Sequence, residues 1–153
     1  MKCFLKMLLT ASAGWLAMNV AMFLTFRLIG FGMNADGVLL DPRWQSPKLI
    51  AVWTTQEPLP LVITQPSCII GGLFVFAFLH AVVYRSQSPH WPIGVVPRAL
   101  RLAGLTFGIG YAFWEFFTPF NQLGEPLPLI MLELLFWASM ALAESFAIAT
   151  VAE

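Results

Sequence analysis

The chain has 153 residues, of which 59% are hydrophobic and only 10% are charged, and its mean hydropathy is +0.79. Soluble domains usually contain about 25% charged residues, and a chain this short cannot bury so much apolar surface in a water-soluble fold. Its net charge of zero gives no indication of a nucleic-acid partner. We therefore predict one integral membrane domain over residues 1–153, with the lipid bilayer as its main partner.

Four stretches are apolar enough to cross a membrane, which takes about 20 mostly apolar residues. They cover residues 3–29, 66–84, 98–118 and 127–149. The first begins like a secretory signal peptide, because lysines precede it and Ala11-Ser12-Ala13 resembles a cleavage site. Its apolar run continues to Phe26, however, which is longer than a signal-peptide core. We therefore expect the first stretch to remain as a membrane anchor.

The longest polar stretch, residues 30–56, comes after the first span. Three glycines at its start are typical of turns, and Ser46 followed by Pro47 is typical of a helix start. The residues after them have an apolar side, which predicts a short amphipathic helix on the outer membrane surface, with Trp44 and Trp53 at the level of the lipid headgroups. A loop packed on the helices is an equally good interpretation.

The distribution of lysine and arginine predicts the orientation in the membrane. Five basic residues lie on one side of the predicted spans: Lys2, Lys6, Arg85, Arg98 and Arg101. Three basic residues lie on the other side: Arg27, Arg43 and Lys48. Four acids lie on that side as well. We therefore expect both termini and the turn at 85–98 to be cytoplasmic, in a cell membrane (inner or plasma) crossed several times.

One short motif occurs twice, as EPLPLVIT from Glu57 and as EPLPLIML from Glu125. Proline has no N–H to lose and suits a first helical turn, and a preceding glutamate is favoured at the positive end of the helix dipole. We therefore interpret Glu57 and Glu125 as helix-entry caps and each Pro-Leu-Pro as a first turn. The repeat also suggests two helical hairpins, by duplication or by convergence on a good helix start.

The predicted fold is therefore all-α, a four-transmembrane-helix bundle built as two hairpins. Small residues favour close packing in lipid. They form Gly104-x-x-x-Gly108 with Gly110 beyond it on the third span, which could pack internally or against a partner helix. Trp15 and Trp137 fall in mid-span, and we expect them to pack in the core.

Ionisable groups inside a bilayer cost at least about 2.5–3.5 kcal/mol each and usually face the bundle interior. Glu133 and Glu144 are 11 residues apart, so they lie about 20° apart around one helix and about 16 Å apart along it. Counting depth from the span centres predicts two polar layers. The outer one joins Glu115 and Glu133, and Arg27 could belong to it. The inner one joins His80 and Glu144, and Asn19 lies at a depth between the layers.

These intramembrane side chains admit two main interpretations. Two carboxylates at one depth can share a proton, and His80 can exchange a proton with Glu144 near neutral pH, which predicts a proton or cation path. The alternative is that the groups hold the bundle together through hydrogen bonds between helices. A lone histidine can also bind haem or chlorophyll, but no second histidine lies at its depth. A di-metal site would require Glu-x-x-His pairs, which the sequence lacks, so we expect no metal and no cofactor.

No run matches a phosphate loop, a dinucleotide fingerprint, a nucleophile elbow, an HExxH zinc helix or a CxxC pair. The leading prediction is therefore a structural or accessory membrane component, without recognisable enzymatic chemistry, that packs with itself or with a partner complex. The second is a small transporter or proton-conducting protein that uses the intramembrane acids. A membrane enzyme acting on lipid or quinone, with the outer loop as a lid, is a third possibility without a supporting motif.

Overall fold

A computed structural model describes residues 2–153 of the chain, and the side chains of residues 4–153. Over this part the protein is all-helical, and no strand occurs in it. Three helical runs are long and apolar enough to cross a membrane: Phe4–Phe31, Pro66–His90 and Leu127–Ala152. They contain α1 (Lys2–Met22) with the π-helical η1 (Phe23–Phe31), then α4 (Pro66–Gln87) with the short 3-10 helix η3 (Ser88–His90), and finally α7 (Leu127–Ala152). Three of the predicted spans are thereby supported as membrane helices.

The region of the remaining predicted span, 98–118, is also helical but differs in character. It consists of α5 (Val95–Leu105), the π-helical η4 (Thr106–Ala112), the single turn α6 (Phe113–Glu115) and the π-helical η5 (Phe116–Gln122), which succeed one another without a break. This run is not among those apolar enough to qualify as a membrane span. Its glycines and polar side chains lower its apolar content, so its crossing of the membrane remains a prediction.

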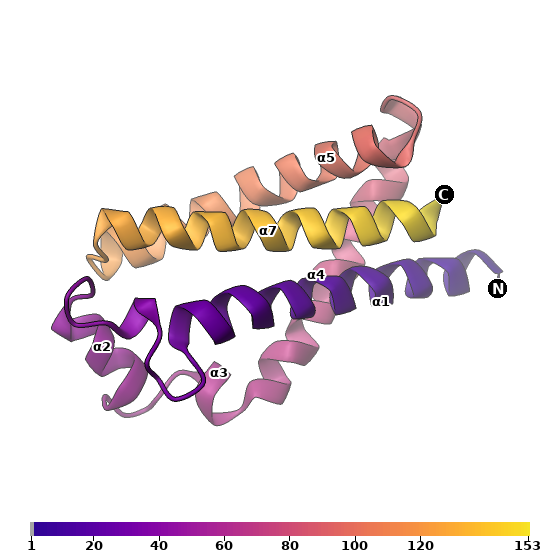
Figure 1. Ribbon diagram of the computed structural model, residues 1–153. Helices are drawn as coiled ribbons and strands as arrows, with labels where there is room; N and C mark the ends of the chain where they lie inside the picture. Colours follow the sequence, from indigo (N-terminus) through magenta and orange to yellow (C-terminus); the bar gives the residue numbers. More distant parts are fainter. Residues whose placement is uncertain (1) are drawn as a thin grey trace.

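The long helices pack through α1 and α7 (Figure 1). Helix α1 lies between α4 and α7, and α5 packs against the other side of α7. In the view of Figure 1, α1, α5 and α7 run at shallow angles to one another, while α4 crosses behind α1 at a steep angle. Both termini lie at the same end of the molecule. All four long helical runs meet near this end, in a cluster that includes Ala11, Ala81, Ala99 and Ile148.

The closest approach of α1 to α7 occurs at a glycine. A Cβ atom at Gly14 would lie 2.7 Å from Cγ1 of Ile148, and 3.4 Å from Cγ of Glu144. Real Cβ atoms do not come within 3 Å of another heavy atom, so only glycine fits here without a shift of its neighbours. In contrast, a Cβ added at Gly104, Gly108 or Gly110 would meet no atom within 4 Å. The small residues of the GxxxG motif therefore face away from the rest of the chain and do not serve internal packing.

Residues 32–56, which we call the outer segment, fold over the end of the bundle that lies opposite the termini (Figure 1). The 3-10 helix η2 (Val38–Leu40) buries Leu39 in a cluster with Leu129 and Phe136. The predicted amphipathic helix is confirmed as α2 (Pro47–Thr54), with the Ser46 side chain accepting a hydrogen bond from the Leu49 N–H at 3.3 Å.

The side chains of α2 and its flanks partly meet the expectation for a surface helix. The ring of Trp53 lies 4.7 Å from that of Phe31, between centroids. Leu49 is buried, whereas Trp44 is 56% exposed. The helix therefore packs partly on the protein, and contact of its exposed side with lipid headgroups stays a prediction.

The interpretation of Glu57 and Glu125 as helix caps is wrong, because a proline is the N-cap in each EPLP copy. In the first copy, Pro60 is the N-cap of a single turn, α3 (Leu61–Thr64), so Pro-Leu-Pro precedes the helix and does not form its first turn. In the second copy, Pro126 is the N-cap of α7, so Leu127 and Pro128 lie in the first turn of the helix and the predicted entry is confirmed in part. In neither helix does a capping side chain accept a hydrogen bond from an N–H of the first turn.

The reason lies in the prolines themselves. In the second copy, the N–H groups of Leu129 and Ile130 already donate to the Pro126 carbonyl, at 2.9 and 3.2 Å, and Pro128 has no N–H to offer. Few donors of the first turn are therefore left for the carboxylate of Glu125. In the first copy, the Glu57 carboxylate instead accepts from the N–H of Leu59 at 3.2 Å, within the turn.

Candidate functional site: two buried groups of acidic side chains

The inner polar group joins α4 to α7. Nδ1 of His80 lies 2.8 Å from Oε1 of Glu144, in hydrogen-bonding contact, and the Glu144 side chain is fully buried. The structure thus brings together the two residues that depth counting assigns to one layer. Helix α1 also covers Glu144. It can approach this closely because Gly14 has no side chain.

One oxygen of this buried acid has no partner. Among the described residues, no donor lies within hydrogen-bonding distance of Oε2 of Glu144, and the neighbouring hydroxyl of Ser145 is also buried without a partner. Most buried polar groups in proteins are hydrogen-bonded, so each exception requires an explanation. An exchangeable proton or a small polar ligand at the free oxygen would supply one.

The outer polar group consists of Glu115, Glu125 and Glu133, which we call the outer acid cluster. One carboxylate oxygen from each residue lies within 4.8 Å of the corresponding oxygens of the other two. Glu115 is fully buried and Glu125 is 6% exposed. Three different parts of the chain supply these acids: α6, the loop before α7, and the second turn of α7.

Glu115 is held by a tryptophan of α7. Nε1 of Trp137 donates to Oε2 of Glu115 at 2.8 Å, while Oε1 of Glu115 is buried and has no hydrogen-bond partner among the described residues. α6 is a single turn between two π-helical segments. π-helical turns are rare, and they occur frequently at functional sites.

Glu125 is tied to the outer segment. Nε2 of Gln45 donates to its Oε1 at 2.5 Å, and both side chains are buried. Burial raises the pKa of the Glu125 carboxyl above its usual value, the hydrogen bond from Gln45 opposes that rise, and the charge of Glu115 adds to it. The neutral acid is therefore favoured at this position.

An aromatic pair lies between the two groups. The ring of Trp137 stacks on that of Tyr111 at 4.8 Å between centroids, and the Tyr111 hydroxyl donates to the sulfur of Met18 on α1 at 3.3 Å. Trp137 therefore contacts Glu115 through its N–H and Tyr111 through its ring. Trp15 donates from Nε1 to the Ile70 carbonyl of α4 at 2.8 Å. Both mid-span tryptophans thus join helices, as their depth predicts.

Arg27 and Asn19, the polar candidates of the first span, bind backbone carbonyls. Arg27 does not join the outer acids, so that prediction is wrong; its guanidinium donates to the carbonyls of Gly32 and Met33, at 2.9 and 3.0 Å, where the first helical run ends. Carbonyls at a helix end lack intrahelical partners and attract cations, which explains this choice. Asn19 donates to the Trp15 carbonyl of its own helix at 2.8 Å.

Two features of the outer acid cluster are not predicted from the sequence: the membership of Glu125 and its contact with Gln45. From the sequence, Glu125 is assigned to the helix entry, although the nearness of this residue to the start of the span that carries Glu133 could have placed it with the acids. Gln45 lies 80 residues from Glu125 in the chain, and no pattern in the sequence relates the two. Only the packing of the outer segment brings Gln45 to this place.

Three carboxyl groups this close together and mostly buried cannot all be ionised, because each negative charge disfavours the next. They can share protons, or their oxygens can bind a hard cation such as Mg²⁺, Ca²⁺ or Mn²⁺. Glu115, Glu125 and Glu133 are therefore the residues that could hold a metal ion, although the sequence predicts none.

No family model matches the chain, and searches of curated proteins and of solved structures find no match either. The features of the chain that bear on its function are therefore its three apolar helices and its two buried acidic groups.

Proposed function

We propose that this protein is a four-span membrane protein of the cell (inner or plasma) membrane that binds protons, or a small cation, on its buried acids and passes them between the two polar layers. The fourth crossing would be the helical run 95–122. Its packing against α7 and its contribution of Glu115 to the outer acid cluster support this assignment. The excess of lysine and arginine near the termini supports a cytoplasmic location for both ends.

The observation that carries the proposal is the pair of unpartnered carboxylate oxygens. Oε1 of Glu115 and Oε2 of Glu144 are both buried and lack a hydrogen-bond partner among the described residues. An acid with a purely structural role would be expected to have its oxygens satisfied, because an unsatisfied buried polar group costs about 1–3 kcal/mol. Intramembrane ionisable residues usually line ion or proton pathways.

The position of the two groups along α7 fits such a pathway. Glu133 and Glu144 are separated by about 16 Å of helix, and the Tyr111 hydroxyl provides one buried polar atom beside this helix. His80 extends the inner polar group to α4, because its Nδ1 lies 2.8 Å from Oε1 of Glu144.

The test is flux in a reconstituted system. The purified chain is inserted into liposomes, a pH gradient is imposed, and the internal pH is monitored for wild type, Glu133→Gln, Glu144→Gln and the control Glu57→Gln. Glu57 is an exposed acid outside the helices, so its variant should conduct like wild type. We expect flux in wild type and its loss in the first two variants.

Two outcomes contradict the proposal. Absence of wild-type flux under gradients of protons, sodium, potassium and calcium ends the transport function. Flux that is unchanged in Glu133→Gln and Glu144→Gln removes these acids from the path.

A second candidate is an accessory membrane component that packs with itself or with a partner complex. It is favoured by the fact that the buried acids also connect separate elements, as Glu144 does with His80, Glu115 with Trp137 and Glu125 with Gln45. The open glycine face of the run 95–122 would suit a neighbouring helix. This second function is favoured if neither the wild type nor any variant conducts ions and Glu133→Gln lowers the thermal stability.

A further inference from the structure

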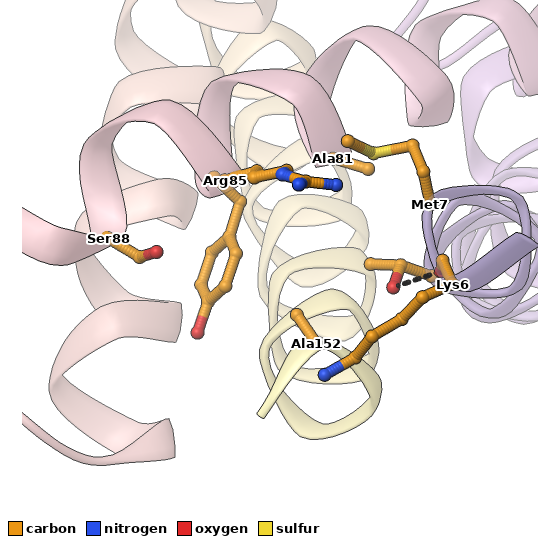
Figure 2. A pocket seen from close by; sticks show the side chains of 8 residues that line it. Lys6, Met7, Ala81, Arg85, Ser88 and Ala152 are labelled. Carbon is orange, nitrogen blue, oxygen red and sulfur yellow. Dashed lines mark hydrogen bonds between the residues drawn. The ribbon is translucent and has the colours of Figure 1, made fainter. Parts of the chain in front are cut away.

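A cavity of about 440 Å³ opens at the end of the molecule where both termini lie, between α1, α4 and α7. Its lining is mixed. Figure 2 shows the side chains of Lys6 and Met7 from α1 and of Arg85 from α4 around this space, with Ala152 of α7 on another side. The polar side chains of Thr10, Tyr84 and Ser88 complete the lining with Ala81. Among the residues with described side chains, no acid lines the cavity.

The two cations of this cavity lack acidic partners. Among the residues with described side chains, neither Lys6 nor Arg85 forms an ion pair, whereas Arg98 pairs with Glu153 at 3.0 Å. Glu153 also accepts a hydrogen bond from the hydroxyl of Tyr84, a lining residue, at 3.3 Å, and the charge of this acid is already compensated by Arg98. The cavity therefore carries two uncompensated positive charges.

The ends of the helices do not cancel this charge. α7 ends at Ala152, and its dipole places about half a negative charge there. α4 ends nearby at Gln87 with the same sign. Two half charges amount to about one, against the two full positive charges of Lys6 and Arg85, so the cavity attracts anions.

We propose that this cavity binds the phosphate of an anionic membrane lipid, with Lys6 and Arg85 as the phosphate ligands and Ser88 as a hydrogen-bond donor. Basic pockets between membrane helices at the cytoplasmic surface are suited to anionic headgroups. Met7, Ala81 and Ala152 form the apolar part of the lining, against which the start of an acyl chain can lie. The location at the end of three membrane-type helices favours a lipid phosphate over a soluble one.

The experiment measures lipid binding to the purified full-length chain. Phosphatidylglycerol, phosphatidylcholine and inorganic phosphate are titrated separately into the detergent-solubilised protein, and bound lipid is quantified by native mass spectrometry alongside the midpoint of thermal unfolding. The proteins are wild type, Lys6→Gln, Arg85→Gln, the double variant, and Arg101→Gln as a control. Arg101 is an exposed cation of α5 that does not line the cavity.

We expect phosphatidylglycerol to bind more tightly than phosphatidylcholine. Each single substitution should weaken phosphatidylglycerol binding roughly fivefold, and the double substitution about 25-fold, while Arg101→Gln stays close to wild type. The double variant Lys6→Arg with Arg85→Lys keeps both charges and should retain binding. Lys6 and Arg85 are both exposed, so their replacement should leave the fold intact.

Three results would overturn the proposal. Equal affinity for the two lipids means that charge is not recognised. Preference for phosphatidylglycerol that survives the Lys6→Gln and Arg85→Gln double substitution places the lipid elsewhere. Inorganic phosphate that binds as tightly as phosphatidylglycerol, and competes with it, makes this an anion site without lipid specificity. None of these results depends on ion flux, so the failure of this proposal is distinguishable from that of the transport function.

Discussion

His80 of α4 and Glu144 of α7 are in direct contact, with 2.8 Å between Nδ1 and Oε1, although 64 residues separate them in the chain. Few other contacts join these two helices, because α4 crosses the bundle at a steep angle and packs mainly on α1. The pair is therefore both a connection across the bundle and the centre of the inner polar group.

Replacing either member of this pair should cost stability. In a double-mutant cycle with His80→Phe and Glu144→Gln, we expect a coupling energy on the order of 1 kcal/mol, which is typical of polar contacts between membrane helices. The measurement is the free energy of unfolding in detergent for wild type, the two single variants and the double variant. Additive effects of the two substitutions would mean that the contact contributes nothing.

The glycine at the α1–α7 contact gives a steric prediction. Gly14→Ala places a Cβ 2.7 Å from Cγ1 of the buried Ile148, so the helices or the isoleucine must move, and overpacking of this kind costs about 1–3 kcal/mol. Gly104→Ala is the matched control, because its Cβ would meet nothing within 4 Å and alanine favours the helix by up to about 1 kcal/mol. Thermal unfolding of the two variants should therefore shift in opposite directions.

Equal behaviour of the two variants would contradict the packing of α1 against α7. The Gly14→Ala substitution should also disturb the inner pair, since the new Cβ would lie 3.4 Å from Cγ of Glu144. The effect of His80→Phe should accordingly be smaller in the Gly14→Ala background than in wild type.

Glu125 should make stability depend on pH. Burial raises its folded-state pKa above the ordinary value of 4.5, so the folded state holds this proton more tightly than the unfolded state does. Its contribution to stability is therefore complete below about pH 4.5 and is lost as pH rises through the folded pKa. In Glu125→Gln the decline of stability with pH should be shallower, as measured by thermal unfolding at a series of pH values.

The slopes of the two proteins are compared so that the contribution of Glu125 is separated from that of the other ionisable groups. The difference between wild type and Glu125→Gln reports Glu125 together with its repulsion from Glu115. Identical slopes in the two proteins would show that Glu125 is not buried as an acid in the folded state. Glu57→Gln, which alters an exposed acid, should leave the slope unchanged.

The predictions from sequence that succeed are those that require only helix geometry. Counting residues from the span centres assigns His80 and Glu144 to one layer, and this works because an α-helix rises by a constant 1.5 Å per residue. The start of α2 is predictable because Ser46 and Pro47 act locally, on the N–H groups of their own first turn. Neither inference requires knowledge of distant contacts.

The failures come from competition between local and distant partners. The sequence suggests that Arg27 could contact the outer acids. Arg27 instead binds carbonyls at the end of its own helical run, which lie nearer in the chain. Glu125 suits the helix dipole by its position, whereas packing of the outer segment brings Gln45 to its carboxylate. The π-helical segments η4 and η5, which flank Glu115, are also not predicted by any pattern in the sequence.

The central claim is that the buried acids of α7 and its neighbours hold exchangeable protons, and infrared spectroscopy of the lipid-reconstituted protein tests it most directly. At neutral pH we predict a carbonyl band of protonated carboxylic acid in wild type, which shifts in D₂O and loses intensity in Glu133→Gln but not in Glu57→Gln. A spectrum with only ionised carboxylates, or a band that Glu133→Gln leaves unchanged, would contradict the account.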